Sequence, residues 1–156
     1  MFTGSTTLEC WPVAKSVQDT MQLPRSHDKA IISSLYNSNI NQIATMCTSE
    51  LKVWEAETGK IIYSISDVNG KGVELTCMCL DASGYRLATA GSNGSIKVWD
   101  FGAGQELKHK KGKKSREDLS ISTLMYTKIK DVLYLIVTET SNKIKIYLVN
   151  SNITIF

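Results

Sequence analysis

The chain has 156 residues, of which 42% are hydrophobic and 21% are charged, a balance typical of a folded globular domain with a sizeable core. Its longest apolar run, residues 132–137, is far shorter than the roughly 18 residues that a membrane span needs, and residues 1–20 show no apolar signal-peptide core. The composition therefore excludes a transmembrane helix and gives no support to secretion. We expect a cytoplasmic protein, with the cilium and the nucleus as alternatives.

The predicted strands follow one another at regular intervals, and turn residues separate them. Short apolar or alternating runs bounded by Gly, Asn, Asp and Ser indicate strands, because no apolar pattern with a 3.6-residue period persists. Residues 6–11 and 13–21 are expected to supply the third and fourth strands of an incomplete group. Three groups of four strands are expected after it, at 31–36, 42–47, 51–55 and 60–65, then 75–80, 86–91, 95–100 and 105–108, then 121–126, 132–138, 143–148 and 153–156. The chain is therefore predicted to be all-β.

The third strand of each group has an aromatic residue at or near its end, and these residues recur about every 45 positions. The phrases are Leu-Lys-Val-Trp at 51–54 and Ile-Lys-Val-Trp at 96–99, with Trp11 before them and Ile-Lys-Ile-Tyr at 144–147 after them. A repeat of this length, with four short strands in each copy, is typical of β-propeller blades. One supersecondary unit has therefore been copied along the chain.

In these phrases, and in the turn at 92–94 that precedes one of them, the chain resembles the WD40 repeat family over nearly its whole length. The resemblance implies a partial β-propeller of about three and a half four-stranded antiparallel blades. We expect an incomplete blade at 1–26, blades at 27–66 and 67–109, a basic inter-blade loop at 110–118 and a degenerate blade at 119–156. The segment 24–38 is also similar to long, many-repeat WD proteins associated with cilia or male germ cells.

The number of blades determines whether the predicted propeller can form a closed ring. Propellers close with about four to eight blades, so we expect the chain not to close alone and to be part of a longer protein. Repeats stabilise one another through their neighbours. We therefore expect the isolated chain to aggregate, or to unfold with little cooperativity.

WD40 blades contain a buried hydrogen-bonded network of His, Ser or Thr, Asp and Trp, and the resemblance implies which residues form it here. The candidates are His27, Thr45, Trp54, Thr89, Asn93 and Trp99. The first full copy has only Ser49 or Glu50 near the Asp position, and the second has Lys71-Gly72 where the His is expected. The last copy offers Tyr147 and at best Thr138. We therefore expect incomplete networks with a structural role.

No group of residues predicts a catalytic, cofactor or metal site. Neither histidine lies in a pattern that pairs a nucleophile with a base and an orienting group. The cysteines, at 10, 47, 77 and 79, lack the Cys-x-x-Cys spacing of zinc and redox sites, so we expect buried free thiols in a reducing compartment. The stretch 67–78 lacks both the spacing of a phosphate loop and the final carboxylate of a calcium loop. We expect a non-catalytic protein-interaction scaffold without cofactor or metal.

The segment 108–116 is the alternative candidate for function. The segment contains five Lys and one Arg, whereas the net charge of the whole chain is only +3. The positive charge of the chain is therefore concentrated in this segment. The candidate partner-binding residues are Lys108, Lys110, Lys111, Lys113, Lys114 and Arg116. Clustered Lys attracts anionic partners, but the segment lacks the aromatic side chains on which single-stranded nucleic acids stack. We therefore favour protein or peptide partners over nucleic acid, with a solvated inter-blade insertion as the other interpretation of this segment.

Overall fold

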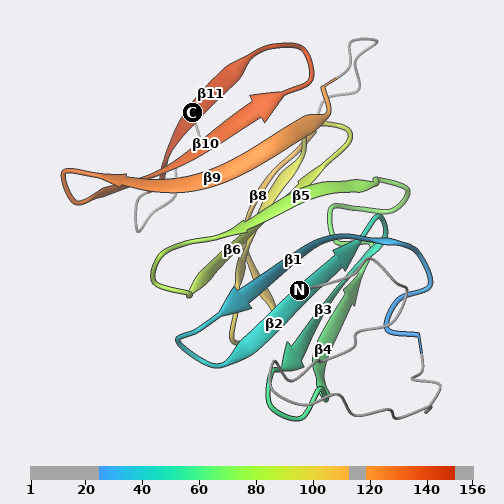
Figure 1. Cartoon of the computed structure of the whole chain (residues 1–156). Coiled ribbons are helices and arrows are strands. Elements are labelled where there is room, and N and C mark those ends of the chain that lie inside the picture. The colour runs from blue at the N-terminus through green and yellow to red at the C-terminus, as the bar shows by residue number, and fades with distance from the viewer. Residues whose placement is uncertain (1–24, 113–118, 150–156) are drawn as a thin grey trace, which may run out of the picture.

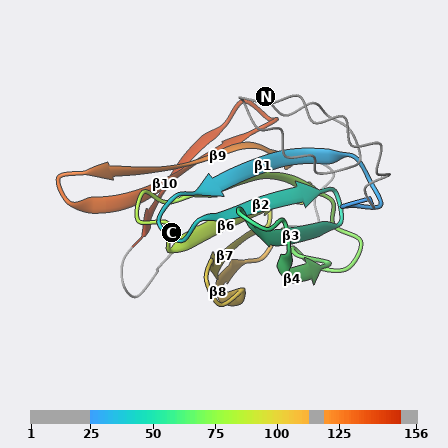
Figure 2. The same cartoon turned by 60° about the horizontal axis from the view of Figure 1, so that its bottom comes forward.

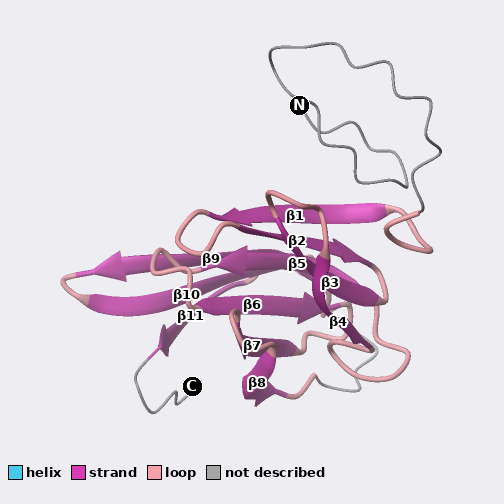
Figure 3. Ribbon diagram, turned by 90° about the horizontal axis from the view of Figure 1, so that it is seen from below, coloured by secondary structure: helices cyan, strands magenta, loops and turns pink. Residues whose placement is uncertain are grey.

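The structure is a computed structural model that describes residues 25–112 and 119–149 (Figure 1). The described residues form strands and no helix, as the colours of Figure 3 show. The expected all-β class is confirmed. The strands predicted at 6–11, 13–21 and 153–156 lie outside the described residues.

Eleven strands are arranged in three antiparallel sheets, which we call blades 1, 2 and 3. Within each blade, every strand pairs with the strand that follows it in the chain. Blade 1 consists of β1 (Ile31–Asn37), β2 (Gln42–Cys47), β3 (Glu50–Glu55) and β4 (Ile61–Ser66). Blade 2 consists of β5 (Leu75–Leu80), β6 (Arg86–Gly91), β7 (Ile96–Asp100) and β8 (Gln105–Lys110). Blade 3 consists of β9 (Ile121–Ile129), β10 (Val132–Glu139) and β11 (Ile144–Val149).

The first strands of the three blades lie next to one another, since β1 contacts β5 and β5 contacts β9. Figure 2 shows β4 and β8 on the opposite side of the molecule from β1 and β9. This arrangement, with first strands together and fourth strands apart, is that of blades around a propeller axis. The described blades do not close into a ring, so the expected open, partial propeller is confirmed.

Two hydrophobic clusters hold the blades together, one in each blade-to-blade contact. Leu51 and Val53 of blade 1 are buried in the first cluster together with Leu87 and Trp99 of blade 2. The opposite face of blade 2 is buried in the second cluster against blade 3. Because side chains alternate between the two faces of a strand, blade 2 contributes to both clusters.

The local sequence explains most strand ends. Strands β2, β5 and β6 begin and end where the sequence predicts. Gly94 has a positive φ of 76° in the turn between β6 and β7, a conformation that favours glycine. The predicted basic loop at 110–118 begins too early, because β8 continues to Lys110 by pairing with β7. Lys108 and Lys110 therefore lie on a strand.

Candidate functional site

A partly buried chain of hydrogen bonds joins four side chains of blade 1. The Trp54 indole Nε1–H donates to Thr45 Oγ1 at 2.7 Å, and Thr45 Oγ1 lies 2.7 Å from His27 Nε2. His27 Nδ1 lies 2.9 Å from Glu50 Oε1. A carboxylate only accepts, so His27 Nδ1 carries the proton and Nε2 accepts from the Thr45 hydroxyl. The structure thus joins the three predicted residues His27, Thr45 and Trp54, and Glu50 supplies the fourth position.

Blade 2 contains an equivalent network in which an asparagine takes the place of the histidine. The Trp99 Nε1–H donates to Thr89 Oγ1 at 3.0 Å, and the Thr89 hydroxyl donates to Asn69 Oδ1 at 2.8 Å. The Asn69 amide then donates to Ser95 Oγ at 3.2 Å. All four residues are buried. Asn93, which the sequence placed in this network, lies outside it, because its side-chain oxygen accepts instead from the Ser95 backbone N–H at 3.0 Å.

These two networks correct the expectation that the hydrogen-bonded network is incomplete in every repeat. In blade 1, Glu50 stands where the family pattern has Asp. In blade 2, Asn69 and Ser95 stand where the pattern has His and Asp, and the Lys71-Gly72 pair plays no part in the contacts. A carboxamide can accept from one neighbour and donate to another at the same time. Asn69 therefore links Thr89 to Ser95 as His27 links Thr45 to Glu50.

Blade 3 has no such network among its described residues. Val137 occupies the position of Thr45 and Thr89, since it pairs with Lys145 as they pair with Lys52 and Lys97. The candidate Thr138 lies one residue further along β10, and its hydroxyl is 3.1 Å from Ser122 Oγ. The hydroxyl of Tyr147 instead accepts a hydrogen bond from the Lys110 ammonium of blade 2, and this ammonium lies 4.4 Å from the centre of the Tyr147 ring.

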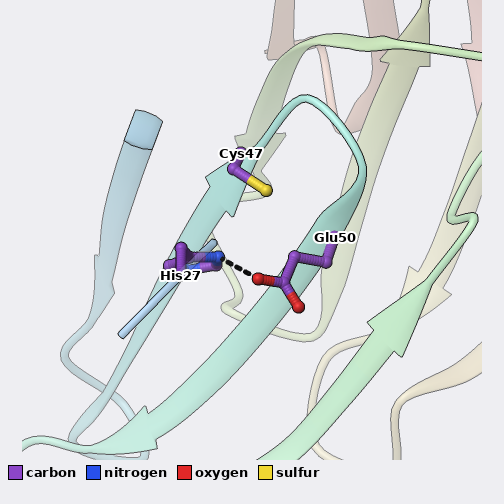
Figure 4. Close-up of side chains that lie close together, drawn as sticks. All are labelled: His27, Cys47 and Glu50. Atoms are coloured by element: carbon purple, nitrogen blue, oxygen red, sulfur yellow. Dashed lines mark hydrogen bonds and ion pairs between the residues drawn. The ribbon is translucent and has the colours of Figure 1, made fainter. Parts of the chain in front are cut away.

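One group of potential metal ligands belongs to the network of blade 1. Ligand atoms of His27, Cys47 and Glu50 lie within 4.8 Å of one another (Figure 4). Both ring nitrogens of His27 are already hydrogen-bonded, and the Lys52 ammonium lies 3.1 Å from Glu50 Oε1. A metal ion would have to break the bond to Thr45 or to Glu50 and approach a cation. The arrangement therefore fits a hydrogen-bonded network better than a metal site.

Solved structures share this arrangement of blades. The crystal structure of the RRP9 WD40 repeats aligns with 85% of this chain at a TM-score of 0.70 and 19% identity, and the structure of U3-55K aligns with the same share, TM-score and identity. The C-terminal WD40 domain of Sif2 aligns with 78% of the chain at a TM-score of 0.63 and 12% identity. The chain has the WD40 repeat fold. It covers 39%, 40% and 34% of those three chains, respectively.

No protein-family model matches the chain, so the likeness rests on structure. The described residues hold two four-stranded WD40 blades and three strands of a third. The similarity to ciliary or germ-cell WD proteins stays a prediction. None of the described residues forms a helix that is long and apolar enough to cross a membrane.

The electrostatics of the WD40 blades disfavour a reactive group. Burial lowers the pKa of His27 below its ordinary value, against the opposing effect of Glu50, so the ring is held neutral. Burial raises the pKa of the Cys77 thiol, and it raises that of Cys79 to about 12. A thiol that stays protonated is a poor nucleophile. Among the described residues, Cys47, Cys77 and Cys79 are free thiols; Cys47 is buried, as expected, whereas Cys77 and Cys79 are only partly buried.

The basic segment is described only in part. Lys108 and Lys111 are exposed, whereas Lys110 is half-buried by its contact with Tyr147. Three further candidates, Lys113, Lys114 and Arg116, lie outside the described residues. The structure thus divides the predicted group, because one lysine of β8 links two WD40 blades while its neighbours face solvent.

Sequence reasoning missed a group of exposed apolar residues at one end of the blades. Ile40, Tyr85 and Ile129 lie at the turns β1–β2, β5–β6 and β9–β10, and they are 43%, 53% and 55% exposed. These turns lie along the left side of Figure 1. We call this group the turn surface. Large apolar side chains at turns, where polar residues are usual, are the signal that could have revealed it.

Hydrogen bonds between blades fix two of these turns relative to each other. The Asn37 Nδ2–H donates to the Gly84 carbonyl at 2.7 Å, and the Asn39 Nδ2–H donates to the Ser83 carbonyl at 2.6 Å. These bonds run from the end of β1 and the turn that follows it to the turn β5–β6. Two of the three turns that form the turn surface are therefore held in a fixed arrangement.

Proposed function

We propose that the chain is a non-catalytic scaffold that binds a protein or peptide partner at the turn surface. The observation that carries this proposal is the exposure of one large apolar side chain at the same turn of each of three successive blades. Single exposed apolar residues are common. A repeated series at one end of a rigid fold is more typical of an interaction site, because apolar and aromatic anchors dominate protein interfaces.

The described polar groups support a non-catalytic role. The two ring nitrogens of His27 are used within its network, and the raised pKa of the Cys77 and Cys79 thiols keeps both protonated. WD40 domains such as those of the matched structures generally serve interaction. The free thiols support a reducing compartment, and we infer a cytoplasmic location, with the cilium and the nucleus as alternatives.

The turn surface can be tested with a displayed library of random peptides as the probe. The library would be selected on the immobilised chain, and the recovered peptides would be measured against a triple variant, Ile40→Ser, Tyr85→Ser and Ile129→Ser. Leu107→Ser is the matched control, since Leu107 is 39% exposed but lies on β8. We expect the triple variant to lose binding at least tenfold and the control to keep it. Equal binding by all three proteins would contradict the proposal.

The second candidate is binding of an anionic partner through residues 108–116. Its support is the charge of the segment together with the exposure of Lys108 and Lys111. Binding of this kind weakens steeply with salt, because counterions are released. Heparin is a suitable probe, and replacing the five lysines of the segment by Gln should lower both the affinity and its salt dependence. Unchanged affinity and salt dependence would remove this candidate.

A further inference from the structure

The outer edge of blade 2 is the strand β8, which pairs with β7 on one side and with no other described strand. It lies on the opposite side of the molecule from the first strands β1 and β9 (Figure 2). Further blades of a longer propeller would continue the ring beyond blades 1 and 3, so they would not cover the outer edge of the middle blade. An edge strand presents unpaired backbone N–H and C=O groups. This edge can therefore accept a further strand.

The end of β8 and the residue after it are basic, and we call residues 108–111 the basic edge. Lys108 and Lys111 are exposed, and neither forms an ion pair with another described residue. The one acid of β8, Glu106, is already paired with Lys97 at 2.7 Å. The positive charge of the basic edge is therefore available to attract an anionic partner.

Contacts with both neighbouring elements hold the backbone of the basic edge in place. The register of β8 against β7 shifts at a β-bulge just before Lys108 and is regular from there to Lys110. The Lys110 ammonium donates to the Tyr147 hydroxyl of blade 3 and lies 4.4 Å from the centre of its ring. Gly112 lies so close to Asn93 that a Cβ at this position would overlap the Asn93 carbonyl oxygen. A backbone that is ordered before binding loses less conformational entropy when a partner adds to it.

The lysines of the basic edge determine which kind of strand can pair with it. Lysines on an edge strand oppose pairing with a second copy of the same edge, because like charges would face each other. An acidic strand instead places opposite charges in those positions, and cross-strand pairs of opposite charge stabilise a sheet. Nucleic acids and polysaccharides carry the charge but lack the regular N–H and C=O groups that continue a sheet. The edge therefore favours an acidic segment of a protein.

We propose that an extended, acidic segment of a partner protein adds to the basic edge as a fifth strand of blade 2. Its backbone pairs with the outward N–H and C=O groups of the edge, and its carboxylates pair with Lys108 and Lys111. The pairing extends over about four residues, or roughly 13 Å of strand. This inference rests on the second candidate function, because it names the partner class and the mode of binding for the same basic segment. The turn surface takes no part in it.

Fluorescence anisotropy of a labelled peptide mixed with the full chain tests the proposal. The probe is a peptide of about eight residues with alternating Glu and Val. Its matched control is the same peptide with methylated backbone nitrogens, which keeps the charge but loses the backbone donors. We expect the probe to bind the wild-type chain, and the methylated peptide to bind at least tenfold more weakly.

Charge reversal locates the site. The double variant Lys108→Glu, Lys111→Glu should bind the probe at least tenfold more weakly than the wild-type chain. The matched control is the double variant Lys60→Glu, Lys128→Glu, which changes the net charge equally at exposed lysines of the turn β3–β4 and of β9. We expect this control to bind the probe like the wild-type chain.

Each other result would overturn the proposal. Equal binding of the two peptides would show attraction by charge without strand pairing, and the second candidate function would stand without this inference. Undiminished binding by Lys108→Glu, Lys111→Glu would place the site elsewhere. Binding of heparin without binding of the probe would identify an anionic polymer as the partner class. A chain that bound neither would contradict both the inference and the second candidate function. The comparison of the two peptides on the wild-type chain decides the first point even if a variant fails to fold.

Discussion

Replacing Thr89 by valine should destabilise the chain more than its small change in shape suggests. Thr89 is 0% exposed, and its hydroxyl both accepts from the Trp99 indole at 3.0 Å and donates to Asn69 Oδ1 at 2.8 Å. Valine has nearly the same volume but no hydroxyl, so an indole N–H and a carboxamide oxygen would lose a partner. Leaving a buried polar group unpaired costs about 1–3 kcal/mol. We therefore expect the free energy of unfolding to fall by about 2–4 kcal/mol.

The matched control is Thr89→Ser, which keeps the hydroxyl and removes one buried methyl group. That change should cost about 1 kcal/mol. Urea unfolding followed by tryptophan fluorescence measures both variants, and all chains should be at one concentration because association would shift the midpoint. The unfolding slope should be unchanged, since the same surface is exposed.

A second pair of variants shows whether the decrease in the free energy of unfolding comes from the loss of the hydrogen-bonded network of blade 2. In the background of Thr89→Val, the further change Trp99→Phe no longer removes a hydrogen bond. We therefore expect it to cost less there than in the wild-type chain, with a coupling energy of about 1 kcal/mol or more. The reasoning would be refuted if Thr89→Val cost no more than Thr89→Ser, or if the two substitutions were additive.

Three further predictions concern titration, backbone and thiols. Burial lowers the pKa of His27 below its ordinary 6.5, so stability should be complete above about pH 6.5, fall as the unfolded chain takes up the proton, and level off below the folded pKa. His27→Gln should remove this step from urea midpoints measured against pH. Gly84→Ala should lower Tm more than Gly59→Ala does. Both glycines have positive φ, but a Cβ at Gly84 would lie 2.5 Å from a side-chain oxygen of β1. Equal decreases in Tm would contradict this prediction. Cys77 and Cys79 should react slowly with iodoacetamide at about pH 8 until urea unfolds the chain, because burial raises the pKa of both thiols. Rapid labelling of the native chain, measured by mass spectrometry, would contradict this prediction.

The repeat pattern predicted the fold because its signals are local. Alternating strands, turn residues and the aromatic residue of the third strand each depend on a few neighbouring positions. The network of blade 1 was also accessible, since His27, Thr45 and Trp54 match the family pattern. These residues needed no knowledge of the neighbouring blade.

The network of blade 2 could not be assigned in this way. Asn69 lies in the loop before β5, where spacing varies, and it reaches Thr89 only through the folded chain. Asn93 was the nearer candidate, but its side chain is used by its own turn. In blade 3 a shift of one residue separates Thr138 from Val137. Such a shift places a side chain on the opposite face of the strand.

The exposure of the outward face of blade 3 could not be predicted from the sequence either. Ile144 and Ile146 follow the same apolar alternation as Ile96 and Val98, so their sequence predicts burial for all four. Burial depends on whether another blade covers them. Only the folded arrangement of the described residues shows that Ile144 and Ile146 are exposed.

Hydrogen exchange of the tryptophan indole N–H groups tests the central claim most directly, since the account rests on two equivalent networks that lock Trp54 and Trp99 into their blades. NMR of the chain labelled at tryptophan, assigned with Trp54→Phe and Trp99→Phe, would identify the signals of these two among the three tryptophans. We predict that both indole protons exchange much more slowly than a solvent-exposed indole, and that Thr45→Val and Thr89→Val each accelerate only the proton of their own blade. Exchange of both protons at the rate of a free indole would contradict the account.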